Sequence, residues 1–345
     1  MPKYTGGEFL VMGVPGETLD EKTISVIKRV QPSGFILFAR NIKSPEQVRA
    51  LNDHLRSLVE HEPIICLDEE GGRVSRLAPL LTQRSPSPGD LRRYDDAYAI
   101  RRHGSTSGRL LKLLGFNLNL APVLDIEVYD DPYIVNRPWG VTAFEAYLKA
   151  EQYLIGMRRQ GVLSCGKHFP GYTEAEVDPH KALPVVALKM EDLHAREWLP
   201  FRKLHRKLDL IMTAHVLYPL IDKTGIPSSL SPALVRHVLR DDWKYDGCII
   251  TDDIDMGAIR NEYGVKDACR MAFEAGNDLV LVCHSLDAVE TVADALANVS
   301  HRTQDESYRR ILNLRAKLKT PPAFTQKAFC RLDCEIEKLY KQVAC

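Results

Sequence analysis

Short apolar runs alternate with longer amphipathic stretches over most of the 345-residue chain. Glycine, proline or other turn-forming residues bound each run, and within a run the apolar character is nearly continuous. Such runs are typical of strands in a parallel sheet that is covered on both faces. The predicted strands are Phe9–Val14, Gly34–Phe38, Pro63–Leu67, Phe116–Val123, Val162–Gly166, Leu208–Ala214, Gly247–Thr251 and Asp278–Val282.

A stretch with helical spacing of apolar residues lies between most successive strands. Eight strands alternating with eight helices predict an α/β fold, a (β/α)8 TIM-type barrel in a regular or irregular form. A doubly wound open sheet is the alternative, but no glycine-rich phosphate loop follows the first predicted strand. The predicted helices are Leu19–Val30, Pro45–Glu60, Ala97–Leu114, Ala143–Arg159, Met190–Arg206, Pro232–Asp241, Lys266–Ala275 and Leu286–Ala297.

Two more helical stretches follow the last predicted strand unit. They cover about Gln304–Leu318 and Cys330–Gln342, and Pro321–Pro322 breaks the chain between them. The sequence has no linker of low complexity and no repeat at a short fixed period. We therefore expect residues 1–345 to form a single barrel domain, with residues about 304–345 as a C-terminal helical extension.

Charge and cysteine usage narrow the range of partners and compartments. Lys and Arg together number 46, as do Asp and Glu, so no basic field favours binding to nucleic acid or an anionic membrane. The N-terminus lacks the pattern of a signal peptide, and no apolar run is long enough for a membrane helix. A reducing cytoplasm is the expected location, because four cysteines lie inside apolar runs and the C-terminal ones lack metal-binding CxxC spacing: Cys66, Cys165, Cys248 and Cys283, then Cys330, Cys334 and Cys345.

Polar residues gather where the predicted strands end. One such residue is more often a helix cap or a surface ion pair, but five strand ends of this kind favour a site at the mouth of a barrel. A polyhydroxylated ligand suits such a rim, and Trp139 is a candidate to stack on a sugar face. The segments are Asp68–Arg76, Asp125 with Asn136–Gly140, Lys167–His168, Thr213–His215 and Thr251–Met256.

Other catalytic chemistries find less support. The histidines show no HExxH spacing, and Asp252 and Asp253 are neighbours on one strand, so their side chains point to opposite faces. No GxSxG motif is present, and Cys165 lies within an apolar strand where a reactive thiolate is not expected. We expect neither a metal ion nor another cofactor.

Several motifs, taken in order, resemble glycoside hydrolase family 3, and within it the bacterial β-N-acetylglucosaminidases that act on peptidoglycan fragments during cell-wall recycling. The resemblance covers about Glu8 to His284. It implies a substrate that contains N-acetylglucosamine, such as an oligosaccharide or a muropeptide, and we expect a monomer or a weak dimer. The motifs are LDEEGGRVSRL, NLNLAPVLDI, GKHFPG followed by DPH, MTAHVLYPLID and DGCIITDDIDMGAI.

The resemblance also implies roles for individual residues. Asp252 corresponds to the nucleophile of a retaining mechanism that passes through a covalent glycosyl-enzyme. His180 corresponds to the acid/base, and Asp178 to the carboxylate that orients it. Asp253 and Asp255 are expected to cap the following helix. The implied sugar-binding residues are Asp68, Arg76, Arg137, Lys167 and His168.

This chain departs from the family pattern close to the proposed acid/base. It reads Gly171–Ala175 where relatives usually have GHG, and Pro179 separates Asp178 from His180 where a serine is usual. It also has Asn136–Trp139 where relatives commonly have Arg-Ser-Phe. The alternatives that remain are a phosphorylase, a glycosidase for another β-linked sugar, and a non-catalytic sugar-binding relative.

Overall fold

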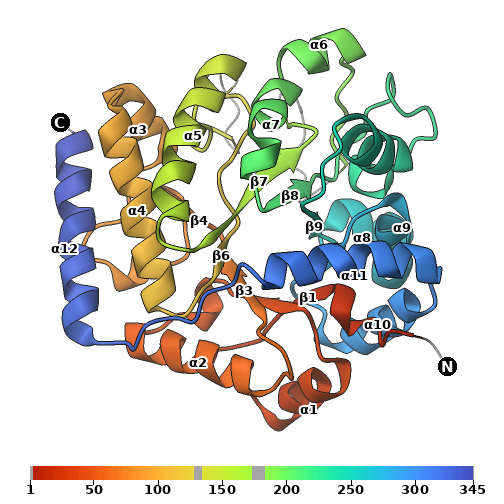
Figure 1. Cartoon of the computed structure of the whole chain (residues 1–345), viewed down its shortest axis with the longest axis horizontal. Coiled ribbons are helices and arrows are strands. Elements are labelled where there is room, and N and C mark those ends of the chain that lie inside the picture. Colours follow the sequence, from red (N-terminus) through yellow and green to blue (C-terminus); the bar gives the residue numbers. More distant parts are fainter. Residues whose placement is uncertain (1–2, 128–133, 173–182, 345) are drawn as a thin grey trace.

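The computed structural model describes residues 3–127, 134–172 and 183–344, and at its centre eight parallel strands close into a barrel (Figure 1). Each strand pairs in parallel with both of its neighbours, in the order β1-β10-β9-β8-β7-β6-β3-β2. The prediction of a TIM-type barrel is confirmed. The strands are β1 (Leu10–Gly13), β2 (Gly34–Ile36), β3 (Ile64–Leu67), β6 (Leu118–Asn119), β7 (Leu163–Phe169), β8 (Leu210–Thr213), β9 (Cys248–Asp253) and β10 (Leu279–Val282).

The barrel takes the regular form, because β2 runs parallel to both β1 and β3. Close approach between strands requires small residues at particular points. A Cβ atom on Gly34 would lie 2.4 Å from the carbonyl oxygen of Ile64 on β3. A Cβ atom on Gly13 would lie 2.1 Å from the carbonyl oxygen of Cys283. Side chains at these positions would push neighbouring strands apart.

Helices cover the outside of the barrel, and side-chain caps fix where many of them begin. Asp20, Ser44 and Thr142 each accept a hydrogen bond from the first turn of the helix that follows, as helix N-caps do. The helices around the barrel are α1 (Glu21–Val30), α2 (Pro45–Ser57), α3 (Pro88–Tyr94), α4 (Ala97–Leu113), α5 (Ala143–Arg158), α6 (Met190–Ala195), α7 (Trp198–Leu204), the π-helix η6 (Ala233–Asp242), α8 (Gly257–Tyr263), α9 (Val265–Ala275) and α10 (Val289–Ala297).

The sequence prediction missed several short elements and merged two helices into one. The expected helix Met190–Arg206 is divided into α6 and α7. Two helices of seven residues, α3 and α8, were not predicted. Nor was a small antiparallel hairpin of β4 (Glu69–Gly71) and β5 (Val74–Ser75) after β3. Elements this short do not complete enough turns or alternations for apolar periodicity to reveal them.

Helix α11 (His301–Arg315) covers the amino-terminal end of the barrel, and lies across it in Figure 1. Its side chains and those just after it bind residues that immediately precede the strands. Arg310 donates to Asp278, one residue before β10, and Lys317 lies 3.0 Å from Asp209, one residue before β8. Arg315 donates to Ser33, one residue before β2. The open end of the barrel is therefore the opposite one, where the strands have their carboxyl ends.

Helix α12 (Gln326–Val343) packs on the outer surface, beside α2, α3 and α4 (Figure 1). Its buried face is apolar and includes Phe329, Leu332 and Ile336. Among the helices that the structure describes, none has the length and apolar character needed to cross a membrane.

We predict that Asp278→Asn lowers the free energy of unfolding by about 3 kcal/mol, the scale for breaking a buried ion pair. The Asp278 carboxylate is fully buried and accepts hydrogen bonds from Arg240, Arg310 and the backbone N–H of Ile249. The amide would leave two guanidinium groups without their counter-ion. Urea denaturation at neutral pH measures the loss.

Asp246→Asn is the matched control. Asp246 pairs with Arg309, which lies on α11 next to Arg310, but both side chains of this pair are exposed. Asp246→Asn should lower the free energy of unfolding by less than about 1 kcal/mol. If both variants lost the same free energy of unfolding, the buried cluster would stabilise the fold no more than an exposed ion pair, and the prediction would be wrong.

Candidate active site

A polar pocket of about 190 Å³ lies at the carboxyl ends of the strands. Side chains from several strands and from the loops after them converge on it, which is the usual place for a site in this fold. All five residues predicted from the sequence as sugar ligands line it. The lining residues are Asp68, Glu70, Val74, Arg76, Arg137, Lys167, His168, Tyr172, Met212, Asp252 and Met256.

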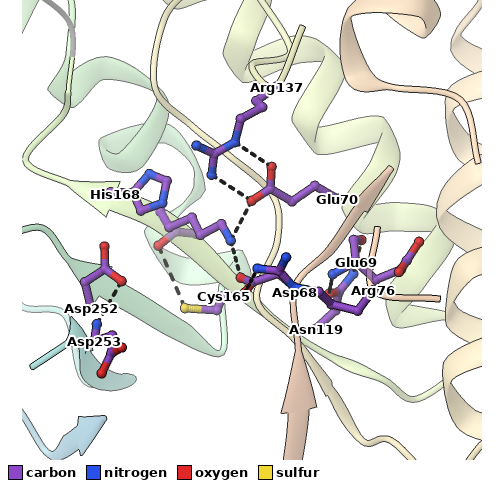
Figure 2. Close-up of polar contacts among 12 residues, drawn as sticks. Asp68, Glu69, Glu70, Arg76, Asn119, Arg137, Cys165, His168, Asp252 and Asp253 are labelled. Atoms are coloured by element: carbon purple, nitrogen blue, oxygen red, sulfur yellow. Dashed lines mark hydrogen bonds and ion pairs between the residues drawn. The ribbon is translucent and has the colours of Figure 1, made fainter. Parts of the chain in front are cut away.

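The floor of the pocket is a connected group of buried charges (Figure 2). Lys167 Nζ lies 2.6 Å from Asp68 Oδ1 and 2.7 Å from Glu70 Oε1, so one ammonium group joins two carboxylates. Arg137 donates two hydrogen bonds to Glu70, both 2.9 Å long. Arg76 donates to the other oxygen of Asp68 at 3.1 Å. The five side chains fix one another, and all five line the pocket.

These contacts keep the whole group ionised despite its burial. Burial alone would raise the pKa of Glu70, but Arg137 and Lys167 outweigh it and hold that pKa well below its usual value. Burial favours neutral Lys167, but Asp68 and Glu70 overcome it and raise the pKa of the ammonium group. The pKa of Asp68 is lowered because Lys167 and Arg76 outweigh its burial. Neither carboxyl group is suited to deliver a proton at neutral pH.

Glu70 is a central member of this group that the sequence prediction missed. It lies on β4, and successive side chains of a strand point to opposite faces. Glu70 therefore faces the pocket, while Glu69 turns away and accepts hydrogen bonds from Ser75 Oγ and the backbone N–H of Leu77. Burial raises the pKa of Glu69 to about 7.

The tight turn of this hairpin depends on Gly71 and Gly72, whose φ angles are +96° and +58°. The sequence suggested such a role for the glycine pair. It gave no signal, however, for which of the two glutamates enters the pocket, because that depends on the register of a hairpin only a few residues long.

His168 is held by Asp125, which the sequence placed at a strand end without assigning it a role. Asp125 Oδ2 lies 2.7 Å from His168 Nδ1, and Asp125 Oδ1 accepts the backbone N–H of Tyr172 at 3.0 Å. The bond at Nδ1 leaves the other ring nitrogen for the pocket. Lys167 and His168 both line the pocket although they are neighbours in sequence. The pairing of β7 with β8 is irregular between Gly166 and Phe169, which interrupts the normal alternation.

Asp252 and Asp253 at the end of β9 have different surroundings. Asp252 lines the pocket, where the hydroxyl of Tyr172 donates to its Oδ2 at 3.4 Å and the backbone N–H of Asp253 donates to its Oδ1 at 2.8 Å. Asp253 points away from the pocket (Figure 2). Its Oδ1 accepts backbone N–H groups of Asp255 and Cys283 at 3.0 and 3.2 Å. The expected opposite orientation of the two aspartates is confirmed.

The expectation that Asp253 and Asp255 cap the next helix is wrong. Helix α8 begins after Met256, without a side-chain cap. Asp255 instead accepts backbone N–H groups of His284 and Ser285 at 2.7 and 3.0 Å. The two carboxylates join the end of β9 to the loop after β10, because unpaired backbone donors there need acceptors.

The suggested sugar-stacking role of Trp139 is also wrong. Its side chain is 1% exposed and packs on Tyr153, with ring centroids 5.2 Å apart. The sequence could not distinguish a buried core indole from one that lines a site. Burial raises the pKa of Cys165, which agrees with the expectation that this thiol is not a nucleophile. Asp178 and His180 lie outside the residues that the structure describes.

Comparison with known proteins places these features in context. Residues 6–314 match the N-terminal domain of glycosyl hydrolase family 3. A protein of Methylococcus capsulatus named Beta-hexosaminidase is 36% identical over 270 residues, which are 77% of this chain and 79% of that protein. A Beta-hexosaminidase of Pseudomonas aeruginosa is 31% identical over 288 residues, which are 83% and 86% of the two chains.

Solved structures show the same similarity. A family 3 β-N-acetylglucosaminidase from a Paenibacillus species superposes with a TM-score of 0.89 at 30% identity, over 98% of this chain and 68% of that one. NagZ from Neisseria gonorrhoeae superposes with a TM-score of 0.83 at 27% identity, over 98% of both chains.

We predict that Glu70→Gln lowers the free energy of unfolding by about 3 kcal/mol at pH 7, because Lys167 and Arg137 lose a buried anion. The pKa of Glu70 is lowered in the folded state, so its ionised form stabilises the fold above the ordinary value of 4.5. That stabilisation is lost as the pH falls below 4.5 and through the folded-state pKa.

The difference in free energy of unfolding between Glu70→Gln and the parent protein should therefore become smaller as the pH falls. Urea denaturation at neutral and acid pH measures it. A difference that is constant or grows as the pH falls would contradict an ionised Glu70.

Proposed function

The chain belongs to glycosyl hydrolase family 3 and is a hydrolase, and on that premise we propose that it is a retaining exo-β-N-acetylhexosaminidase. In this proposal it releases terminal N-acetylglucosamine from muropeptides derived from peptidoglycan. Relatives that match most of the chain carry the name Beta-hexosaminidase, and a structural neighbour is a β-N-acetylglucosaminidase.

The observation that carries the proposal is the position of Asp252. Its carboxylate lines a pocket whose other wall consists of charged donors and acceptors suited to sugar hydroxyl groups. Hydrogen bonds from Tyr172 and from the backbone of Asp253 orient its two oxygens. An ionised and oriented carboxylate beside a bound sugar can attack the anomeric carbon and form a glycosyl-enzyme ester.

The pocket supports an exo-acting enzyme because its charged floor can hold the end of a chain. Lys167 is held by Asp68 and Glu70, and Glu70 in turn holds Arg137, so these side chains lose little conformational freedom on binding the sugar. Donors and acceptors fixed in this way discriminate between sugars through hydrogen bonds that a wrong ring leaves unpaired.

The proton donor has to come from a group other than the described carboxyls of the pocket. The pKa values of Asp68 and Glu70 are both lowered by their cationic neighbours. Burial raises the pKa of Asp253 to about 7, which would suit an acid, but this side chain faces away from the pocket. We assign the acid/base role to His180, with Asp178 as its orienting carboxylate. Tyr172, directly before segment 173–182, lines the pocket.

A second histidine in the site makes this assignment testable. His168 with Asp125 has the arrangement of a general acid/base pair, a carboxylate at one ring nitrogen and the other nitrogen facing the pocket. We propose that it binds the sugar ring instead, because Asp125 also accepts the backbone N–H of Tyr172 and so fixes the His168 ring in one position. The effect of replacing His180 should then depend on the leaving group of the substrate, whereas the effect of replacing His168 should not.

Buried thiols support a location in a reducing compartment, and we place the protein in the cytoplasm. Several cysteines are free and buried on the strands or beside them, whereas oxidising compartments favour disulfides. The buried free cysteines are Cys66, Cys165, Cys248, Cys269 and Cys283.

We predict that a fluorinated N-acetylglucosaminyl fluoride inactivates the protein and leaves one sugar residue attached to Asp252. The fluorine slows hydrolysis of the glycosyl-enzyme, so the ester accumulates. Peptide mass spectrometry locates the label, and Asp252→Asn should remain unlabelled. A label on another residue, or none despite turnover, would rule out Asp252 as the nucleophile.

We predict that His180→Ala slows cleavage of a disaccharide roughly a hundredfold or more, the scale for general acid catalysis, but slows an activated aryl glycoside far less. A good leaving group needs no protonation. His168→Ala is the matched control and should slow both substrates to a similar extent, because a sugar ligand acts whatever the leaving group. Steady-state kcat/KM values test this, and the opposite pattern would transfer the acid role to His168.

A further inference from the structure

The polar strand end Thr213–His215, which the sequence singled out, has its histidine behind the pocket. His215 follows β8 and is completely buried, and it is not among the described residues that line the active-site pocket. A buried histidine needs partners for its ring nitrogens, because an unpaired polar group in the core is costly. The partners of His215 connect it to the end of β9, where the proposed nucleophile lies.

His215 joins two segments of the chain through its two ring nitrogens. Its Nε2 lies 3.0 Å from the backbone carbonyl oxygen of Asp253, and its Nδ1 lies 2.6 Å from Oγ of Ser229. A carbonyl oxygen can only accept, so Nε2 carries a proton. Burial lowers the pKa of His215, which favours the neutral ring. Nδ1 is then an acceptor, and the hydroxyl of Ser229 donates to it.

Ser229 is itself held by buried hydrogen bonds. Its backbone N–H donates to the carbonyl oxygen of Ala214 at 3.0 Å, and its carbonyl oxygen accepts from Nδ2 of Asn277 at 2.8 Å. Oδ1 of Asn277 in turn accepts from the hydroxyl of Thr213 at 2.8 Å. All four residues are buried. The hydroxyl that binds the imidazole therefore has a fixed position, and so does the ring.

The side chain of His215 links β8 to β9 beyond their last backbone pair. The two strands pair as far as Thr213 with Thr251. The next backbone N–H of β8, that of Ala214, donates to Phe169 of β7 instead. The carbonyl oxygen of Asp253 still needs a donor at this point, and the imidazole supplies it.

Asp253 transmits this restraint to the proposed nucleophile. Its backbone N–H donates to Oδ1 of Asp252 at 2.8 Å, and its carboxylate accepts two further backbone N–H groups. With its carbonyl oxygen bound by His215, Asp253 is held at three points around its Cα atom. The backbone of His215 also lies next to the hydroxyl of Tyr172, the other donor to Asp252.

We propose that His215 is a positioning residue for the nucleophile: its Nε2–H fixes the carbonyl of Asp253, and thereby the backbone N–H that orients the carboxylate of Asp252. The inference rests on the proposed function and adds a residue that acts on glycosyl transfer without touching the sugar. In that step an Asp252 oxygen bonds to the anomeric carbon, the bond to the leaving oxygen breaks, and that oxygen takes its proton from the acid. His215 keeps its own proton throughout. A carboxylate aligned in advance lowers the entropic cost of attack.

Two substitutions separate the contacts of the two ring nitrogens. The amide nitrogen of glutamine can take the place of Nε2 and donate to the carbonyl of Asp253, whereas the amide of asparagine reaches only the place of Nδ1, beside Ser229. We expect His215→Asn to lower kcat/KM for an aryl N-acetylglucosaminide roughly tenfold to a hundredfold, the scale for a misplaced reacting group. His215→Gln should retain most of the activity.

Binding of the sugar should not change with these substitutions, because the Lys167 group holds it from the other wall of the pocket. The inhibition constant of N-acetylglucosamine should therefore be the same in the parent protein and both variants. His237→Asn, at an exposed histidine on η6, is the surface control and should leave kcat/KM unchanged. Equal losses of kcat/KM in His215→Asn and His215→Gln would contradict the inference, since a role in packing does not distinguish the two nitrogens.

His215→Asn could fail to fold, which circular dichroism would show, and Ser229→Ala then takes its place. This substitution removes the hydroxyl that orients the imidazole ring. It should lower kcat/KM by a smaller factor and leave the inhibition constant of N-acetylglucosamine unchanged. An unaltered kcat/KM in Ser229→Ala would show that the orientation of His215 has no effect on the reaction.

Crystal structures of the parent protein and the variants test the inference without a substrate. The hydrogen bond from the backbone of Asp253 to Asp252 should persist in His215→Gln and be lost in His215→Asn, or in Ser229→Ala if that variant replaces it. A carboxylate of Asp252 that keeps its position in the disruptive variant would overturn the inference. A parent protein that cleaves no aryl N-acetylglucosaminide would overturn the proposed function, and the position of Asp252 would still decide the role of His215.

Discussion

The contact of Lys167 with Asp68 and Glu70 is the interaction on which the candidate site depends. Its ammonium group is almost completely buried, and burial of an unpaired charge is prohibitively costly. The two carboxylates make this burial possible, and Arg76 and Arg137 complete their pairing. Asp68, Glu70 and Arg76 follow β3, whereas Lys167 lies on β7 and Arg137 lies between β6 and α5. The closed barrel is therefore what brings the charges together, and the charges in turn fix the geometry of the pocket.

The two ends of the barrel use buried charge for different purposes. At the amino-terminal end, Asp278 with Arg240 and Arg310 joins α11 to the strands. At the carboxyl end, the charged side chains of Asp68 and Arg137 surround an open pocket. Buried ion pairs thus stabilise the amino-terminal end of the barrel and position side chains for a ligand at the carboxyl end. In this fold the amino-terminal face generally serves stability and the carboxyl face carries the site.

The order of strands and helices could be predicted from the sequence because apolar runs of strand length are a local signal. Lys167 and Asp252 could be placed in the site for the same reason, since each follows such a run directly. Glu70 and Asp125 could not be assigned, because a hairpin register and a loop path decide which carboxylate faces the pocket. Trp139 was misplaced because its burial depends on packing against Tyr153, a contact between distant segments.

The alternation of side chains along β9 gives two neighbouring aspartates different tasks. Asp252 faces the pocket, where a carboxylate beside the sugar can act as the nucleophile of the proposed mechanism. Asp253 faces the opposite way, binds the backbone after β10, and contacts His284, which in turn is held by Arg40. The strand that carries the proposed nucleophile is thus joined through the neighbouring side chain to the loop after β10. This connection fixes the end of β9, so the carboxylate of Asp252 is held in position before a sugar binds, and a nucleophile positioned in this way lowers the entropic cost of attack at the glycosidic bond.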